Sequence, residues 1–429
     1  MATRRGSREE RRAEIVRVAA AVFAQHGYGA ATLQEIADRL AVTKTSLYRH
    51  VQGKEELLGA IVGEALGDGR AILERYRQAE GPVLERLRGV VADHVRHFVR
   101  NLDVTTVYLH EMHRLPTTLR ERFDHDGMDY QRSMRDLVQE GRSAGVVRSE
   151  LDPGLVALQI LGSITWMYRW YRPGGRLDPD AIADQLAEVM VNGLAVPQGG
   201  TSLGRRPRKR VSGRPPAGAL DSAEGAGGAR LRRSEVVEVA ASVFAARGYG
   251  GASLQEIADR LGILKGSLYH YIDAKDDLLL EVVQRTYDGG YSRLRQHVEM
   301  PGDVPDRLRN LITDQVMFFV NNVTPTSVYL HESHRLPDAV GTRLRRAGPG
   351  YHESIRSLFD EGRRAGTIRA DMDPGLAALQ VLGSLNWMYR WYHPGGRLMP
   401  ARIADQLADV VLHGVAAPAE ADSTDRTAQ

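Results

Sequence analysis

The chain contains one sequence twice. The motif LQEIADRL at residues 33–40 recurs unchanged at residues 254–261, YLHE at 108–111 recurs at 329–332, and WMYRWY at 166–171 recurs at 387–392. Each pair lies 221 residues apart, so no net insertion or deletion separates the copies. The spacing is too long for the stacked units of a solenoid. The sequence therefore predicts two tandem copies of one domain-sized fold.

Helical periodicity dominates both copies. A first apolar helix face is expected at Ile15, Val18, Ala19, Val22 and Phe23, ending at Gly27, and again at Val236, Val239, Ala240, Val243 and Phe244, ending at Gly248. Thr32 with Glu35, and Ser253 with Glu256, have the spacing of a capping box and each open a second helix. No stretch alternates strictly between apolar and polar residues, so the predicted fold class is all-α.

Composition limits the kind of protein. The 429 residues include no cysteine, which excludes disulfides and thiolate metal sites and fits a reducing cytoplasm. No apolar run approaches the ~20 residues of a transmembrane helix, and the basic N-terminus has no apolar stretch of a signal peptide behind it. We therefore expect a cytoplasmic, nucleoid-associated protein with no membrane partner.

Basic residues are placed unevenly. Residues 197–230 carry six Arg and one Lys against one Asp and one Glu, although the whole chain has a net charge of only +3. This segment is rich in Gly, Pro and Arg and cannot bury a core, so it is a predicted linker. Residues 205–214 of it are either a plain solvated tether or an extended arginine-rich segment that enters a DNA minor groove.

Lysine is rare and clustered. Only five of the 57 basic residues are lysines, namely Lys44, Lys54, Lys209, Lys265 and Lys275. Four of the five follow the repeated LQEIADRL motif closely. A lysine ammonium is a compact charge on a flexible stem and suits a phosphate.

The segment after LQEIADRL has the pattern of a helix-turn-helix. Residues 41–43 form a short turn, Thr43 is a good N-cap, and residues 44–50 (KTSLYRH) are expected to be helical. Leu47 and Val51 then face inward, while the outward face combines positive charge, hydroxyls and an aromatic ring, as a DNA-recognition helix requires. The alternative for such a short pattern is a helical bundle with a solvated polar face.

LQEIADRL, a three-residue turn, KTSLYRH and then GKEELL together resemble the N-terminal signature of the TetR (tetracycline-repressor) family, in both copies. The resemblance implies a three-helix DNA-binding domain followed by a helical ligand and dimerisation domain, and a double-stranded DNA operator as partner. Family members usually act as homodimers of single units. Two intact modules joined by a long linker predict that one chain folds as an intramolecular pseudo-dimer, with a homodimer of two chains as a further possibility.

Carried over residue by residue, the resemblance gives the DNA contacts and two departures. The contacts are Thr43, Lys44, Thr45, Ser46, Tyr48, His50 and Lys54 in copy one, and Lys265, Gly266, Ser267, Tyr269, Tyr271 and Lys275 in copy two. The family usually has an aromatic residue where this chain has Val51 and Ile272. Leu264 stands where a capping hydroxyl is expected, so copy two either binds DNA more weakly or uses Leu264 against a thymine methyl group.

The last two helices of each copy are the predicted bundle helices. Residues 155–164 are mostly apolar, which indicates a helix buried on both sides. The final helix carries one apolar stripe, at Ile182, Leu186, Val189 and Met190, and again at Ile403, Leu407, Val410 and Val411. In the TetR family these two helices form the four-helix dimer bundle. Residues 173–175 and 394–396 (PGG) are predicted helix-stopping turns.

The stretch from YLHE through EGRSAGVV to LGSITWMYRWYRPGG resembles the sensor domains of TetR-type regulators of fatty-acid and sterol catabolism, many of which respond to acyl-CoA thioesters. An effector of this class needs apolar walls with Arg near one end. Arg169 and Arg390 stand among aromatic residues and need either a neighbouring Glu or an anionic ligand as partner. The ligand-binding candidates are Tyr108, Glu111, Arg114, Trp166, Arg169 and Trp170, and in copy two Tyr329, Glu332, Arg335, Trp387, Arg390 and Trp391.

Catalytic and metal sites are not expected. His110 and His113 are three residues apart, whereas a zincin motif needs four, and His94 and His97 correspond to Gln315 and Phe318 in copy two. We therefore predict neither enzyme activity, cofactor nor metal. The favoured function is a ligand-responsive regulator, most simply a repressor. The alternative is an architectural or constitutive DNA-binding protein without an effector.

The predicted domain boundaries follow from these motifs. They are a DNA-binding domain at residues 1–54, a sensor and dimerisation domain at 55–196, the linker at 197–230, a second DNA-binding domain at 231–275, a second sensor domain at 276–416 and a polar tail at 417–429.

Overall fold

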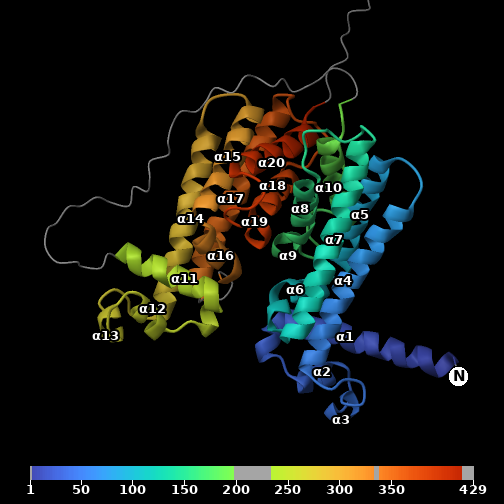
Figure 1. Cartoon of the computed structure of the whole chain (residues 1–429), viewed down its shortest axis with the longest axis vertical. Helices are drawn as coiled ribbons and strands as arrows, with labels where there is room; N and C mark the ends of the chain where they lie inside the picture. The colour runs from blue at the N-terminus through green and yellow to red at the C-terminus, as the bar shows by residue number, and fades with distance from the viewer. Residues whose placement is uncertain (1, 198–232, 333–337, 418–429) are drawn as a thin grey trace, which may run out of the picture. The chain divides into compact units, whose positions relative to one another are not determined.

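The computed structural model describes residues 2–197, 233–332 and 338–417. They fall into two compact units, unit 1 (Met1–Val196) and unit 2 (Pro197–Gln429), drawn from blue to green and from yellow to red in Figure 1. The predicted linker segment at residues 205–214 lies outside the described residues. No helix in the described part of the chain is long and apolar enough to cross a membrane.

Unit 1 consists of helices. They are α1 (Ala2–Ala30), α2 (Leu33–Arg39), α3 (Lys44–Leu47), α4 (Lys54–Gln78), α5 (Val83–Arg100), α6 (Leu102–Glu111), the 3-10 turn η1 (Met112–Arg114), α7 (Thr117–Ser143), α8 (Pro153–Thr165), α9 (Met167–Trp170) and α10 (Pro179–Leu194). The short helices α2 and α3 lie at one end of the unit (Figure 1).

Unit 2 repeats this order. Its helices are α11 (Arg233–Gly251), α12 (Leu254–Arg260), α13 (Lys265–Leu268), α14 (Lys275–Glu299), α15 (Val304–Asn321), α16 (Val323–Glu332), α17 (Asp338–Arg364), α18 (Pro374–Asn386), α19 (Met388–Trp391) and α20 (Pro400–Val415). No strand occurs among the described residues, where isolated bridges join Val147 to Ala195 and Ile368 to Ala416. The prediction of an all-α chain with two tandem copies is confirmed.

The expected break at the first glycine is a kink rather than an end. Gly27 has φ 75° and ψ 150°, outside the helical region, and Gly248 has φ 67° and ψ 160°. One further helical turn follows each glycine, so α1 runs to Ala30. A side chain at this positive φ would be strained, which makes glycine the suitable residue for turning the chain here.

One apolar core joins the helix-turn-helix to the helices behind it. Phe23 of α1 and Ile36 of α2 belong to the same buried cluster as Leu58 of α4 and Val107 of α6. Unit 2 has the corresponding cluster. Because interiors are close-packed, a shift of α4 or α6 is transmitted to the helix-turn-helix.

The remaining helices form the larger part of each unit. In unit 1, α5 packs against α10, α4 against α7, and α7 against α8. Most of helix α8 is buried, as predicted for residues 155–164, but Gly154, Leu158, Leu161 and Thr165 form one half-buried face. The predicted stripes of the final helices are also buried, at Ile182, Leu186, Val189 and Met190, and at Ile403, Leu407, Val410 and Val411.

Candidate nucleic-acid interface and effector site

The predicted turn and recognition helix of unit 1 are held by local contacts. The Thr43 side chain accepts a hydrogen bond from the backbone N–H of Ser46 at 3.1 Å and caps α3. Leu47 and Val51 are buried, as expected. The regular helix is shorter than the predicted 44–50, because α3 ends at Leu47 and residues 48–50 form a turn. Arg12 of α1 donates to the carbonyl of His50 at 3.1 Å and fixes that turn.

The outward face of α3 is available to a partner. Lys44 and Thr45 are exposed, Tyr48 is exposed over half its surface, and Ser46 and His50 are half-buried. Cationic, hydroxyl and aromatic groups thus gather on one short surface, the combination that holds phosphates and reads base edges.

Unit 2 presents the same surface with one defect. Lys265, Gly266 and Tyr269 are exposed, and Ser267 and Tyr271 are half-buried. Leu264 occupies the N-cap position without any side-chain hydrogen bond, and 80% of its surface is exposed. The cap is therefore missing in unit 2, and an apolar side chain projects at the start of the recognition helix.

Lys54, predicted as a phosphate contact, points into the protein. Its Nζ donates to the carbonyls of Tyr28 and Ala31, both at 2.6 Å, and lies 3.3 Å from the carbonyl of Gly29. Burial, together with the nearby Arg114, lowers the pKa of Lys54.

Lys275 does the same in unit 2. Its Nζ donates to the carbonyls of Tyr249 at 2.8 Å and Ala252 at 3.0 Å. In this arrangement the two lysines hold the end of the first helix against the helix that follows the recognition helix.

Glu111 and Glu332, predicted to face an effector, contact the DNA-binding part of their unit. The Glu111 carboxylate accepts the backbone N–H of Tyr28 at 3.2 Å, and its other oxygen lies 2.6 Å from Nε of Arg114. Glu332 accepts the N–H of Tyr249 at 3.1 Å. The kink at Gly27 presents the Tyr28 amide to this carboxylate. Arg335 and the side chain of His113 lie outside the described residues.

The other predicted ligand residues of unit 1 lie on α6 and α9 or directly beside them. The guanidinium of Arg169 lies 5.7 Å from the ring centroid of Trp166, and Arg390 lies 5.7 Å from that of Trp387. An aromatic face is therefore one partner of each arginine, which neither predicted alternative included. Trp166 is buried, Trp170 half-buried, and Tyr108 packs on the edge of the core shared with the helix-turn-helix. In unit 2, Tyr329 lies 6.4 Å from Tyr287.

A groove in unit 1 was not anticipated. It has a volume of about 460 Å³ and lies between α4 and α7, lined by Arg70, Ala71, Leu73, Glu74 and Arg77 of α4 and by Asp129, Tyr130, Arg132 and Ser133 of α7. We call it the α4–α7 groove. The sequence did contain a signal for it, since its three arginines align with Tyr291, Val298 and Glu353 of unit 2. This signal lies in residues that differ between the two copies, not in the residues that they share.

The inner wall of the groove leads to a buried polar pair. The Tyr130 hydroxyl bonds to Nε2 of His94, and Nδ1 of His94 lies 2.7 Å from the carbonyl of Val90. A carbonyl requires a donor, so Nδ1 carries the proton and Nε2 accepts. Burial lowers the pKa of His94 to about 4, so the ring is neutral at physiological pH.

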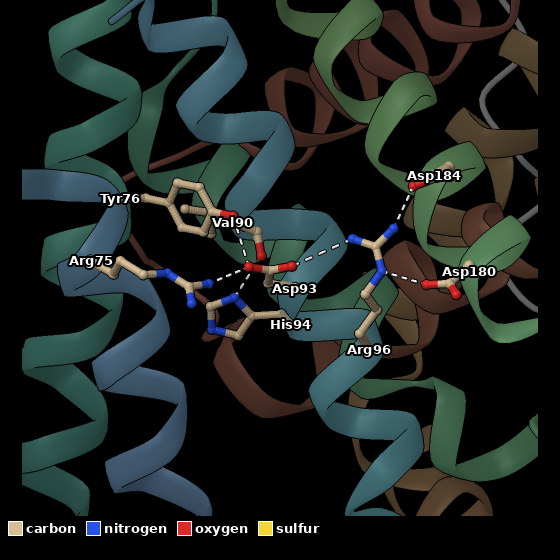
Figure 2. Close-up of polar contacts among 8 residues, drawn as sticks. All are labelled: Arg75, Tyr76, Val90, Asp93, His94, Arg96, Asp180 and Asp184. Atoms are coloured by element: carbon tan, nitrogen blue, oxygen red, sulfur yellow. Dashed lines mark hydrogen bonds and ion pairs between the residues drawn. The ribbon is translucent and has the colours of Figure 1, made fainter. Parts of the chain in front are cut away.

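A polar network connects α4 through α5 to α10, the final helix of unit 1 (Figure 2). Asp93, next to His94 on α5, accepts the Tyr76 hydroxyl of α4 at 2.7 Å. Arg96 of α5 donates to Asp180 at 2.6 Å and Asp184 at 2.8 Å, both on α10. Direct polar contacts therefore join α4 to α5 and α5 to α10.

Among the described residues no cluster of three or more His, Asp or Glu side chains could hold a metal ion. The geometry is that of two polar recognition surfaces, each joined through a shared core and a carboxylate to a larger helical body.

The comparisons with known proteins agree with this arrangement. The family model described as "Bacterial regulatory proteins, tetR family" matches residues 15–61 and 236–282. The model described as "Tetracyclin repressor-like, C-terminal domain" matches residues 80–194 and 301–415.

Several curated and solved relatives are similar to one unit. The HTH-type transcriptional repressor KstR2 of Rhodococcus jostii is 31% identical over 189 residues, 44% of this chain and 92% of the relative. The fatty acid metabolism regulator protein of Bacillus subtilis is 22% identical over 42% of this chain and 94% of its own. The solved ketosteroid transcriptional regulator KstR2 of Mycobacterium tuberculosis is 27% identical, covering 45% of this chain and 99% of its own, with a TM-score of 0.42.

Both family models match twice, in the same order in each unit, and together they account for most of the chain. The protein belongs to the TetR family of helix-turn-helix transcriptional regulators and carries two complete family units in tandem.

Proposed function

We propose that this chain is a ligand-responsive transcriptional repressor that binds a two-part operator through both helix-turn-helix modules and is released by a small effector of the acyl-CoA class. The observation that carries the proposal is the repeated carboxylate contact, Glu111 with the Tyr28 amide and Glu332 with the Tyr249 amide. It joins α6 and α16 directly to the DNA-binding modules, so an effector that moves either helix changes the recognition surface.

The proposed DNA contacts are the exposed residues of the two recognition surfaces. Lys44 and Lys265 hold phosphates, Thr45, Tyr48 and Tyr269 lie beside them, and Thr43 and Ser46 keep α3 in place. Gly266, Ser267, His50 and Tyr271 complete the predicted set. Because their Nζ atoms already bind backbone carbonyls, we assign Lys54 and Lys275 to positioning rather than to phosphate contact.

We further propose that one chain forms an intramolecular pseudo-dimer. Two complete units are present, and a predicted linker of 34 residues reaches on the order of 30 Å on average, which lets the units meet. In this arrangement α8 and α10 face α18 and α20, as the family's dimer bundle would require. The domain boundaries predicted from the sequence belong to the same proposal.

The effector class is supported by sequence resemblance and by charge. The sensor resembles those of acyl-CoA-responsive regulators, and a curated relative is a fatty acid metabolism regulator. An acyl-CoA combines an apolar chain with a phosphate-rich head. The α4–α7 groove offers three arginines to such a head, beside two carboxylates, Glu74 and Asp129. Arginine binds phosphate oxygens through several donors at once.

Operator selection with the purified full chain tests the proposal. Because KTSLYRH and KGSLYHY differ, selected sites should contain two different half-sites about one DNA turn, ~10 bp, apart or slightly more. Titrating the protein–operator complex with acyl-CoAs, free fatty acids and CoA should release DNA with the thioesters only. Perfectly palindromic sites would indicate two chains pairing through like modules. Operator binding that no small molecule changes would favour the architectural alternative.

A further inference from the structure

The α4–α7 groove of unit 1 is lined by three arginines held in place by weak pairs. Arg70 lies 2.7 Å from Asp126, Arg77 lies 3.0 Å from Glu74, and Arg132 lies 2.7 Å from Asp129. These ion pairs are exposed to solvent. Such pairs add little to stability, so a phosphate can replace the carboxylates at small cost.

Unit 2 has none of these arginines. The positions of Arg70, Arg77 and Arg132 are occupied by Tyr291, Val298 and Glu353. The lining of unit 1 carries three arginines against Glu74 and Asp129, a net charge of +1, whereas the matching positions of unit 2 carry Arg295 against Glu353, a net charge of zero. Three arginines around one groove are therefore found in unit 1, whereas the matching positions of unit 2 hold one.

The space is also filled differently. Tyr291 reaches across to α17, where its hydroxyl lies 3.4 Å from Oγ of Ser354, and a Cβ built on Gly350 would lie only 3.1 Å from that hydroxyl. Gly350 stands where unit 1 has Asp129. The Tyr291 ring therefore occupies the volume that lies open between the helices in unit 1.

The interior beneath it is closed by further tyrosines. Tyr287, which replaces Leu66, stacks on Tyr291 at a centroid distance of 5.6 Å and lies 6.0 Å from Tyr351. Tyr291 and Tyr351 are 5.7 Å apart. These three rings, with Tyr329 at their edge, make a packed cluster that unit 1 does not share, because Leu66 and Arg70 stand in the place of two of them.

The deeper polar pair is nevertheless kept in both units. The Tyr351 hydroxyl donates to Oε1 of Gln315, as the Tyr130 hydroxyl donates to His94. Gln315 and His94 each also approach a backbone carbonyl, at 3.0 Å and 2.7 Å. The tyrosine contact is thus shared by the two units, although the carbonyl partners differ, Gly290 for Gln315 and Val90 for His94.

We infer that the effector binds unit 1 alone, with its phosphorylated head on Arg70, Arg77 and Arg132, and that unit 2 binds DNA without sensing. This inference rests on the proposed function and adds its stoichiometry and the site of the anionic group. The ligand then changes the DNA binding of one of the two helix-turn-helix modules. Release from DNA follows a single-site curve with no cooperativity between the units.

Isothermal titration of the full chain with octanoyl-CoA and with free CoA tests the inference. Wild type should bind one molecule of octanoyl-CoA per chain. The variant R70Y/R77V/R132E, which gives unit 1 the residues of unit 2, should lose binding by at least about a hundredfold, since each charge-assisted contact is worth roughly tenfold. R70Q/R77Q/R132Q removes the charge with less change of shape and should show the same loss. R135Q, an exposed α7 arginine outside the groove lining, is the matched control.

Operator affinity without ligand should be the same in all four proteins, which shows that the variants are folded. Two molecules bound per chain, or unchanged binding in either triple variant, would overturn the inference. Absence of binding by both CoA compounds would also overturn it. If an uncharged molecule releases the operator in that case, the protein is still a ligand-responsive regulator. One thioester bound per chain without release of DNA would support the site and refute the proposed response.

Discussion

Glu111 at the end of α6 accepts the backbone N–H of Tyr28 at 3.2 Å, and the same contact recurs 221 residues later between Glu332 and Tyr249 at 3.1 Å. The carboxylate lies in the sensor part of the sequence and the amide in the DNA-binding part. A buried amide without a partner is costly, so each unit depends on this bond. The glutamate of the YLHE motif therefore links the sensor part of each unit to its DNA-binding part by a hydrogen bond.

Removing the Glu111 carboxylate should weaken the contact between α6 and the DNA-binding part of unit 1. We expect E111A to lower the free energy of unfolding of unit 1 by about 1.5–3 kcal/mol, the range for a hydrogen bond to a charged group. Hydrogen exchange at the Tyr28 amide should accelerate, and effector-induced release of DNA should diminish. E121A, an exposed carboxylate on α7, is the control. Unchanged exchange at Tyr28 in E111A would show that the contact is absent in solution.

Alanine variants of the two lysines of unit 1 should differ in the salt dependence of operator binding. Lys44 is exposed on the recognition surface, whereas Lys54 binds backbone carbonyls. We expect K44A to weaken operator binding and to reduce the slope of log K against log salt by roughly one. K54A should lower thermal stability and leave the slope unchanged in whatever protein remains folded. Fluorescence anisotropy over a salt series measures both, and K265A applies the same test to unit 2. If K44A keeps the full slope, Lys44 does not contact a phosphate.

The N-cap that α13 lacks can be introduced by copying the threonine of unit 1 into unit 2. Thr43 caps α3 through the Ser46 amide, whereas Leu264 makes no such bond. We expect L264T to stabilise α13 by about 1 kcal/mol and to raise affinity for the half-site read by unit 2. The converse change, T43L, should cost unit 1 a similar amount.

The outcome of L264T also distinguishes a weak module from one that uses the leucine. Binding measured on operators mutated in one half-site at a time assigns the effect to a unit. A loss of affinity in L264T would mean that the exposed leucine itself contacts DNA, for example a thymine methyl group.

Patterns of three or four residues predicted the local structure of the helix-turn-helix well. The Thr32 and Thr43 caps and the buried Leu47 and Val51 depend on neighbours along the chain, and all four are found as expected. The predicted end of the recognition helix is wrong: α3 ends at Leu47, and the following turn receives a hydrogen bond at the His50 carbonyl from Arg12, 38 residues earlier in the sequence.

The sensor was harder to predict, since its contacts join residues far apart in sequence. Nothing local in YLHE shows that Glu111 reaches an amide 83 residues earlier, or that Lys54 turns inward to carbonyls. The α4–α7 groove depends on how two long helices pack. Only a comparison of the residues that differ between the copies, such as Arg70 with Tyr291, carried information about it.

The buried His94 makes unit 1 sensitive to acid in a way that unit 2 is not. Burial lowers the pKa of His94 to about 4, with the charge of nearby His97 acting in the same direction and that of Asp93 against it. An unfolded histidine has a pKa of about 6.5, so between these values the unfolded chain binds a proton that the folded chain does not. Stability is therefore unaffected above pH 6.5 and falls as the pH drops towards 4, by up to about 3 kcal/mol.

The variant H94Q should remove this dependence, because glutamine does not titrate and Gln315 occupies the same position in unit 2, where it bonds to the Tyr351 hydroxyl and the Gly290 carbonyl. At pH 7.5 we expect wild type and H94Q to have similar stability. Near pH 5, H94Q should be more stable by about 2 kcal/mol, since roughly 1.5 pH units below the unfolded pKa each contribute about 1.4 kcal/mol. Urea unfolding followed by circular dichroism across this pH range measures the difference, with Q315H as the reciprocal change. Parallel pH profiles for wild type and H94Q would show that His94 takes up its proton in the folded chain as readily as in the unfolded one.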